Sequence, residues 1–193
     1  MADQLCTPED LAALLQQDLD LSTATVAIEA ATAVVQEAAG GQRILEVEDD
    51  EITLLGTTES WLDLPQRPVT AVTAVELDGE ALTEGTGTGQ YRRFGARLWR
   101  GCGWAACAYA PSTVAVTNTH GWPAGSQQLQ LARSAVLGLA RAAYVNPAAV
   151  TREAIDDYSV AYEAAAAEME ASQYLKAALR RQYGRRAGLV RIG

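Results

Sequence analysis

The stretch PVTAVTAVELDGEAL, residues 68–82, alternates in side-chain character along its length and then reaches an Asp-Gly pair. A two-residue period is that of a β-strand with one face turned to a core. The expected inner face consists of Val69, Ala71, Thr73 and Val75. Asp78-Gly79 is typical of a two-residue hairpin turn, because both central positions of that turn need a positive φ. The stretch therefore predicts a β-hairpin.

Strand-like segments on both sides extend this hairpin into a β-rich block from residue 43 to residue 122. Upstream, β-branched residues surround an acidic run, and we expect two short strands joined by a turn there. The acids of that turn are Glu48, Asp49, Asp50 and Glu51. All four tryptophans fall within the block. Those that we expect to be at least partly buried are Trp61, Trp99 and Trp122.

Helical patterns precede the block. Thr7 can cap a helix, Pro8 suits its first turn, and Asp10 occupies the capping-box position. A second helix is expected to start after Ser22 and to end at Gly40-Gly41. Its expected apolar stripe consists of Val26, Ala30, Ala33, Val34 and Glu37.

Helical patterns also follow the block. A helical period returns at Gln127, with an expected stripe of Leu129, Ala132, Val136, Leu139 and Ala143. Residues Ala164 to Tyr183 have the composition of a final helix. Gly184 is expected to end that helix in the left-handed conformation, which glycine adopts readily.

This order of segments predicts an α+β protein, a small helical bundle with an inserted β-rich block and an extended C-terminal tail. The N-terminal helices are expected in residues 1–42, the block in 43–122, the C-terminal helices in 123–183 and the tail in 184–193. A chain of 193 residues is long enough for one domain with such an insertion.

The charges of the chain are strongly segregated. The net charge is -9, yet the last eighteen residues, KAALRRQYGRRAGLVRIG, contain six basic residues and no acid. Residues 1–63 hold 14 acids and a single basic residue, Arg43. Because copies in a ring bury unlike surfaces against each other, we expect acidic surface of one copy to meet basic surface of the next. The inter-subunit candidates are Arg92, Arg93, Arg97, Arg100, Glu48, Asp49, Asp50 and Glu51.

The sequence contains no group of residues with the spacing of a catalytic or metal site. The single histidine, His120, could join Cys102 and Cys107, but their C-x4-C spacing departs from C-x2-C and a fourth ligand is missing. We therefore expect no enzymatic activity, no metal and no cofactor. The odd number of cysteines favours free thiols in a reducing compartment. No membrane span and no cleaved signal are expected, because long apolar runs are missing.

Seven short segments follow one another in a recognisable order. They are LPQRPV (64–69), VELDG (75–79), YRR (91–93), LW (98–99), VAVTNTHGW (114–122), IDDYSV (155–160) and LRRQY (179–183). This series resembles the head–tail connector (head completion adaptor) proteins of long-tailed bacteriophages, in the form found in phages of actinobacteria. The resemblance spans residues 5–183 and departs from the family at Asn118, where an aromatic residue is expected.

The resemblance implies a structural role. It implies a ring of twelve copies that joins the portal of the DNA-filled head to the tail completion or head-closure proteins. DNA would pass through the lumen of this ring without sequence-specific binding, which an acidic surface allows. The protein would be found in the virion, at the head–tail interface, after synthesis in the host bacterial cytoplasm.

The basic tail is the expected contact with the portal. Leu189, Val190 and Ile192 alternate with Arg191 in the pattern of a strand that lacks a sheet edge. Since these apolar residues are too few to fold alone, we expect the tail to be mobile in the free protein and ordered on a partner, by strand addition or groove insertion. The candidate partner-interface residues are Arg180, Arg181, Tyr183, Arg185, Arg186, Leu189, Val190, Arg191 and Ile192.

Two other classes of function are weighed against the adaptor. A DNA-binding module would use the six basic charges of the tail to bind phosphates and would show a steep salt dependence. A small metal-dependent or hydrolytic enzyme is disfavoured by the single histidine.

Overall fold

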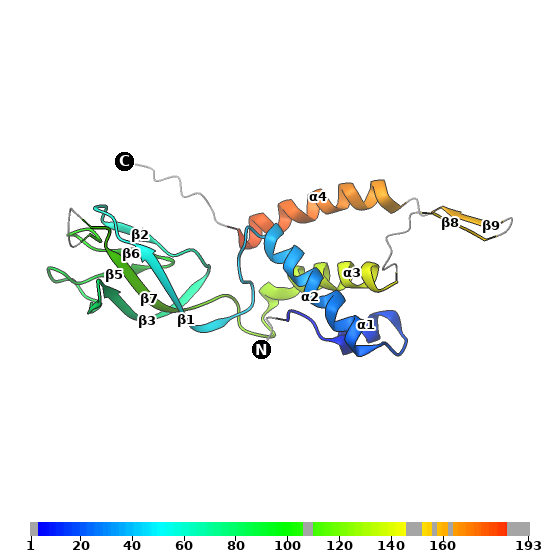
Figure 1. Ribbon diagram of the computed structural model, residues 1–193, viewed down its shortest axis with the longest axis horizontal. Helices are drawn as coiled ribbons and strands as arrows, with labels where there is room; N and C mark the ends of the chain where they lie inside the picture. The colour runs from blue at the N-terminus through cyan, green and yellow to red at the C-terminus, as the bar shows by residue number, and fades with distance from the viewer. Residues whose placement is uncertain (1–3, 106–109, 146–151, 156–157, 162–163, 185–193) are drawn as a thin grey trace. The chain divides into compact units, whose positions relative to one another are not determined.

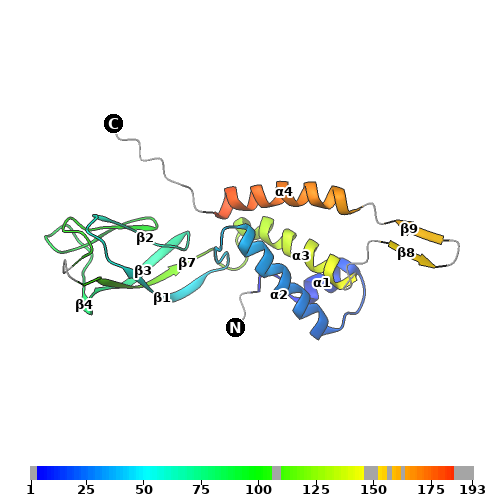
Figure 2. The same cartoon turned by 45° about the horizontal axis from the view of Figure 1, so that its top comes forward.

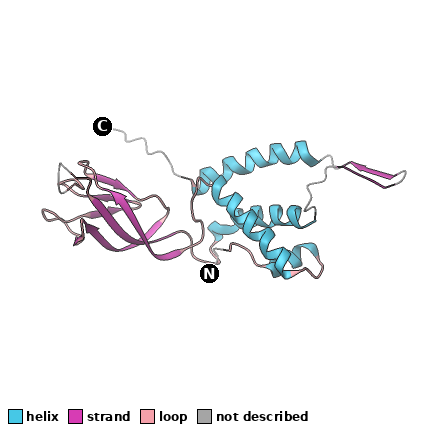
Figure 3. Cartoon of the chain, viewed as in Figure 1, coloured by secondary structure: helices cyan, strands magenta, loops and turns pink. Residues whose placement is uncertain are grey.

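The computed structural model of the chain describes residues 4–105, 110–145, 152–155, 158–161 and 164–184. The chain forms two compact units. The helical unit consists of Met1–Gln42 and Gly125–Gly193, and the β unit consists of Arg43–Ala124. Figure 3 shows that the helices belong to the first unit and that most of the strands belong to the second. The protein is therefore of the α+β class, as the sequence predicts.

The helical unit begins with two capped helices. α1 spans Pro8–Leu15, and the predicted capping box is confirmed, with Thr7 Oγ1 accepting from the Asp10 amide at 3.2 Å and Asp10 Oδ2 accepting from the Thr7 amide at 3.0 Å. α2 spans Leu21–Ala38 and starts earlier than the sequence indicated, because Asp20 is its N-cap. Hydrogen bonds from Ser22 and Thr23 to that carboxylate lower the pKa of Asp20 to about 2.

The core of the helical unit is organised around α3, Gln130–Val145, which follows a short 3-10 helix, Gln127–Leu129. α3 packs against α1, α2 and α4, the last of which spans Ala164–Tyr183 as predicted (Figures 1 and 2). The large buried side chains of this core are Leu11, Ile28, Val35, Leu129, Val136, Leu179 and Tyr183. A two-stranded hairpin, β8 Arg152–Ile155 and β9 Tyr158–Ala161, lies between α3 and α4 in the chain.

The apolar stripe predicted for α2 is wrong. Val26 is 66% exposed and Val34 is 51% exposed, whereas Ile28 and Val35 are fully buried. The sequence of α2 carries apolar residues on two faces, and the face that packs against α3 is the one with Ile28, flanked by alanines. Small residues on that face allow the two helix backbones to approach closely.

The stripe predicted for α3 is half right. Leu129, Ala132 and Val136 are buried, but Leu139 is 37% exposed and Ala143 is also exposed. α2 packs on the face of α3 that carries Ala132 and Val136, and this packing leaves Leu139 and Ala143 at the surface.

The β unit contains two antiparallel sheets. The four-stranded sheet has the order β1-β7-β3-β4, formed by Val47–Leu55, Thr113–His120, Val69–Leu77 and Glu80–Ala81. The three-stranded sheet has the order β2-β6-β5, formed by Trp61–Asp63, Arg97–Trp99 and Arg92–Phe94. One apolar core joins both sheets, with Leu62, Leu64, Val75, Tyr91, Leu98, Trp104, Val114 and Val116 among its members.

The predicted hairpin is present, but its strand does not alternate strictly. Asp78 and Gly79 have φ values of 52° and 84°, as the turn requires. Register shifts between β3 and β7 turn Thr73 to the surface, where its hydroxyl donates to the Thr117 carbonyl at 3.3 Å. A bulge changes which side chains face the core, so the predicted inner face is wrong at Thr73.

The acidic run is a strand and not the predicted turn. β1 continues through Glu48, Asp49, Asp50 and Glu51 and pairs with β7 on one edge. A register shift in this part of β1 accommodates Asp49, whose φ is 49°. Asn118, where the family pattern has an aromatic residue, is buried in β7, which pairs with β1 on one edge and β3 on the other.

The tryptophans differ in their burial. Trp104 is fully buried, and its indole N–H donates to the Ser60 carbonyl at 3.2 Å. Trp99 and Trp122 are half-buried, as predicted. Trp61 is 39% exposed and is thus also partly buried, on the outer side of β2, whose inward position is taken by Leu62.

The two ends of the β unit are held together by a short clasp, which we define as Ile44–Glu46 paired with Gly121-Trp122. The Trp122 amide donates to the Ile44 carbonyl and the Glu46 amide donates to the Trp122 carbonyl, both at 2.9 Å. Gly121 has a φ of +91°, and a Cβ at this position would lie 2.3 Å from the Leu45 carbonyl oxygen. The clasp therefore requires glycine both for backbone conformation and for close approach.

Replacing Gly121 with alanine is expected to destabilise the β unit severely. Gly79→Ala is the matched control, because Gly79 has a similar φ of +84° but a Cβ added there would meet no atom within 4 Å. The control should cost about 1–2 kcal/mol from the left-handed backbone alone. Gly121→Ala should cost clearly more. Urea denaturation followed by tryptophan fluorescence measures this, since all four tryptophans lie in the β unit. Equal losses in the two variants would contradict the clasp.

Candidate partner-binding site

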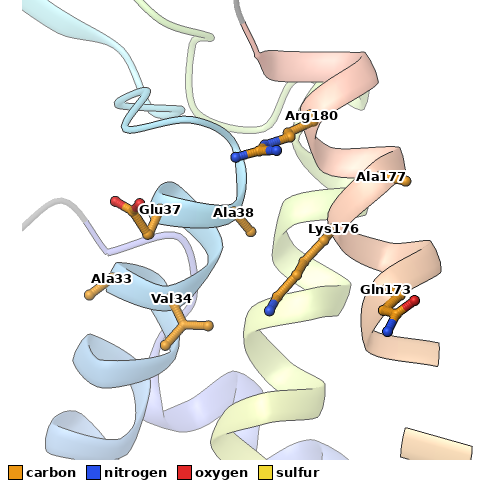
Figure 4. A pocket seen from close by; sticks show the side chains of 8 residues that line it. All are labelled: Ala33, Val34, Glu37, Ala38, Gln173, Lys176, Ala177 and Arg180. Carbon is orange, nitrogen blue, oxygen red and sulfur yellow. The ribbon is translucent and has the colours of Figure 1, made fainter. Parts of the chain in front are cut away.

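A groove runs between α2 and α4 on the helical unit, with a volume of about 760 Å³ (Figure 4). It is lined from α2 by Ala33, Val34, Glu37 and Ala38, and from α4 by Gln173, Lys176, Ala177 and Arg180. The groove brings Arg180, one of the predicted partner-interface residues, together with part of the stripe that the sequence analysis had placed in the core of the bundle.

The α2 wall of the groove is apolar and exposed. Ala33 is exposed and Val34 is 51% exposed, although both belong to a continuous small and apolar stripe of α2. Ala38, half-buried, closes this wall near the end of the helix. An apolar wall beside a hollow of this size is typical of a surface that another molecule covers.

The α4 wall is cationic. Lys176 and Arg180 are one helical turn apart, and their side chains extend from α4 toward α2 in Figure 4. Neither forms an ion pair with a described residue, and the carboxylate of Glu37 is turned away from α4. Two exposed cations beside an apolar wall suit an acidic segment of a partner, which could form charge-assisted hydrogen bonds with them.

Tyr183, one of the candidate partner-interface residues, is buried in the bundle. The side chain is 4% exposed and its hydroxyl donates to the Gln128 carbonyl. Burial raises the pKa of this hydroxyl. The amide of the neighbouring Gln182 side chain donates to the same carbonyl at 3.0 Å. These bonds fix the end of α4 to the 3-10 helix that precedes α3 and so hold the Arg180 wall of the groove in place.

Gly184 ends α4, but not by the predicted left-handed conformation. Its φ lies outside the left-handed region, and its amide donates to the Arg180 carbonyl at 2.9 Å. A Cβ at Gly184 would lie 2.5 Å from that same oxygen, so close approach explains the glycine. Arg181 is exposed on the last turn of α4. The tail candidates Arg185, Arg186, Leu189, Val190, Arg191 and Ile192 lie outside the described residues.

The four candidate arginines of the β unit have different surroundings. Arg93 donates to the Val69 carbonyl at 3.3 Å, and Arg100 donates to the carbonyls of Gly89 and Gly103 at 3.1 and 2.6 Å. These two side chains are therefore engaged within the unit.

The other two arginines lie on the outer face of the three-stranded sheet. Arg97 forms an ion pair with Asp63 at 2.8 Å and lies over the Trp61 ring. The side chain of Arg92 is exposed and forms no hydrogen bond or ion pair with a described residue. It is thus the arginine best placed to meet another chain.

The four candidate acids do not act as a group either. Asp50 Oδ2 lies 3.1 Å from Nε2 of the buried His120, and Asp49 accepts from the Thr73 hydroxyl at 3.3 Å. Glu48 and Glu51 are exposed. The candidate arginines and acids therefore lie on different sheets of the β unit and do not form one site.

The described part of the chain contains no group of three or more histidine, cysteine or acidic side chains that could hold a metal ion. Cys6 and Cys102 are free thiols, and Cys107 lies outside the described residues. None of the described helices combines the length and apolar character needed to cross a bilayer.

Two adjacent valines test which face of α2 is open. Val35→Ala should lower the free energy of unfolding by about 1–3 kcal/mol, because Val35 is 1% exposed in the core. Val34→Ala should change it by no more than about 0.5 kcal/mol. Both substitutions change helix propensity equally, so their difference reports burial. Denaturation followed by circular dichroism at 222 nm makes the measurement, and equal losses would mean that the groove is filled.

Comparison with known proteins adds one finding. No family model matches the chain, and no curated protein matches it. A solved structure described as "Neck of empty GTA particle computed with C6 symmetry" contains a chain similar to this one, at 16% sequence identity and a TM-score of 0.49. The similarity covers 90% of this chain and 84% of that chain. At this identity and TM-score it carries no argument about function, which is derived below from the chain's own residues.

Proposed function

We propose that the protein is a structural adaptor of a phage neck. Copies of the chain form a ring that joins the portal of the DNA-filled head to the tail completion or head-closure proteins. DNA passes through the ring without sequence-specific binding. The role is not catalytic, and it is carried out in the virion.

The observation that carries this proposal is the groove between α2 and α4. It combines an exposed apolar wall, with Val34 at its centre, and two cations that no described acid neutralises, Lys176 and Arg180. Apolar surface with arginine at its edge is the composition of protein–protein interfaces. An adaptor needs such a surface for a partner chain, and this one lies directly before the basic tail.

The tail extends the same binding region. α4 ends at Tyr183, one turn after Arg180, so the tail begins at the end of the groove. We propose that Leu189, Val190 and Ile192 are buried by strand addition or in a groove of the portal. The arginines between them would then pair with acids along that surface.

The identity of the partners comes from the sequence resemblance. The segments that resemble head–tail connector proteins extend over both units of the chain, and the adaptor role, the twelve-fold ring and the portal follow from that family. The net charge of -9 agrees with this role, because an acidic ring would let DNA pass without holding it.

A DNA-binding module is the second candidate. Lys176, Arg180 and Arg181 form no ion pair with a described residue, so they could contact phosphates. The apolar wall beside them favours a protein partner, since phosphate contacts need no exposed valine.

Deleting Gly184–Gly193 tests the proposal. The truncated protein should fold normally and fail to attach to portal-bearing heads, because the tail would supply the ordered contact.

Val34→Asp should also weaken attachment, since it places a charge on the apolar wall. Val26→Asp is the matched control, because Val26 lies on the same helix, is 66% exposed and does not line the groove. Attachment is measured by co-sedimentation with purified heads.

Unchanged attachment of both the truncated protein and Val34→Asp would contradict the adaptor role of this region. Loss of duplex DNA binding in the truncated protein, with attachment to heads intact, would favour the DNA-binding module. A gel mobility shift at moderate salt distinguishes these outcomes.

A further inference from the structure

Charge in the β unit is divided between its two sheets. The unit has eleven acids and six arginines. Strands β1, β3 and β7 of the four-stranded sheet contain five of the acids and no lysine or arginine. The strands of the three-stranded sheet contain three arginines and one acid, Asp63. Of the three arginines, Arg93 is engaged with the Val69 carbonyl, which leaves Arg92 and Arg97 on the outer face of that sheet. The unit thus presents one face with carboxylates and one face with arginines, each built on regular strands.

The basic face is the outer surface of the three-stranded sheet, with Trp61, Arg92, Phe94 and Arg97 at its centre. The rings of Trp61 and Phe94 meet edge to face with centroids 5.5 Å apart, and Arg97 Cζ lies 4.8 Å from the centroid of the Trp61 ring. The residues are ordered by these contacts but not covered, because Trp61 is 39% and Phe94 is 52% exposed. Preorganised aromatic and arginine side chains are the usual anchors of protein interfaces.

The acidic face is the outer surface of the four-stranded sheet. A hollow of about 150 Å³ on this face is lined by Glu51, Ile52, Thr53, Ala74, Glu76, Ala115, Val116 and Thr117. Strand register sets Glu51 opposite Thr117 and Glu76 opposite Ala115, so the two carboxylates stand on either side of β7. The hollow has room for a group the size of a benzene ring, with an acid on each flank.

We propose that the basic face of one copy binds the acidic face of a second copy of this chain. Phe94 enters the hollow of the second copy, and Arg92 pairs with one of the two glutamates at its rim. The inference deepens the proposed function, on which it rests for the closure of the contact into a ring. Because the two faces are unlike, a pair of copies still has one unused basic face and one unused acidic face. Further copies can bind to these faces, so the same contact can repeat from copy to copy.

A second copy fits the basic face better than nucleic acid does. With eleven acids against six arginines, the β unit carries a net negative charge that repels phosphate. Arg97 is already paired with Asp63, whose carboxylate would also face the phosphates. The acidic face, in contrast, has one carboxylate on each side of the hollow, on the two strands that flank β7.

Two double variants of the full-length chain test the proposal. Arg92→Ser/Phe94→Ser removes the basic face, and Glu51→Lys/Glu76→Lys removes the acidic face. Glu29→Lys/Glu59→Lys is the matched control, since both glutamates are exposed and neither lies on the acidic face. Sedimentation velocity over a range of protein concentrations, up to millimolar, measures self-association, and circular dichroism checks the fold.

The unsubstituted chain and the control should self-associate as concentration rises, and each face variant alone should remain monomeric. A one-to-one mixture of the two face variants should form dimers that do not grow further, because each dimer has only one intact contact to make. Salt should weaken the association, since it screens the arginine–glutamate pairs.

Several results would overturn the proposal. They are a monomeric chain at every concentration, self-association that survives in either face variant, or a mixture that grows beyond dimers. Binding of a single-stranded oligonucleotide that is lost only in Arg92→Ser/Phe94→Ser would assign the basic face to nucleic acid instead. Self-association is measured on purified protein without heads. A chain that self-associates in this way but does not attach to heads would therefore contradict the adaptor role and not the contact between copies.

Discussion

The clasp at the base of the β unit is the constraint on which the rest of the structure depends. The helical unit is built from two segments, and the whole of Arg43–Ala124 separates them in the chain. Bonds between Ile44–Glu46 and Gly121-Trp122 bring the entry and exit of the β unit together, so this long insertion acts on the bundle as a short connection. Only glycine at position 121 allows the two backbones to come so close.

The parts of the fold that were predictable from the sequence are those determined by near neighbours in the chain. The capping box of Thr7 and Asp10, the turn at Asp78-Gly79 and the bounds of α4 all follow from local chemistry, and each is confirmed. The face of α2 that is buried was not predictable, because the choice between Ile28 and Val34 depends on where α3 packs. The continuous β1 strand was missed for a similar reason: its acidic residues are held by pairing with β7, which is distant in sequence.

The candidate site was predicted less well than the fold. Arg180 does lie at a groove, but the groove itself needs α2, whose contribution no pattern in the C-terminal sequence could indicate. Tyrosine is common at protein interfaces, and yet the side chain of Tyr183 is buried in the bundle, where its hydroxyl donates to the Gln128 carbonyl. Trp61 was expected to be at least partly buried, and it is 39% exposed; a three-residue strand gives too short a pattern to show that its ring points outward. In each case the missing information is a contact between segments far apart in the chain.

Both units leave apolar surface uncovered next to cations, the helical unit at its groove and the β unit at its basic face. A chain with such surfaces on each unit is suited to an assembly in which every copy contacts neighbours and a further partner. Native mass spectrometry of the full-length chain mixed with a portal protein, the partner that we propose for it, tests this claim most directly. We expect a complex in which many copies of the chain, in a fixed number, are bound to one portal ring. Single copies that never bind the portal, at concentrations where the chain is folded, would contradict the claim.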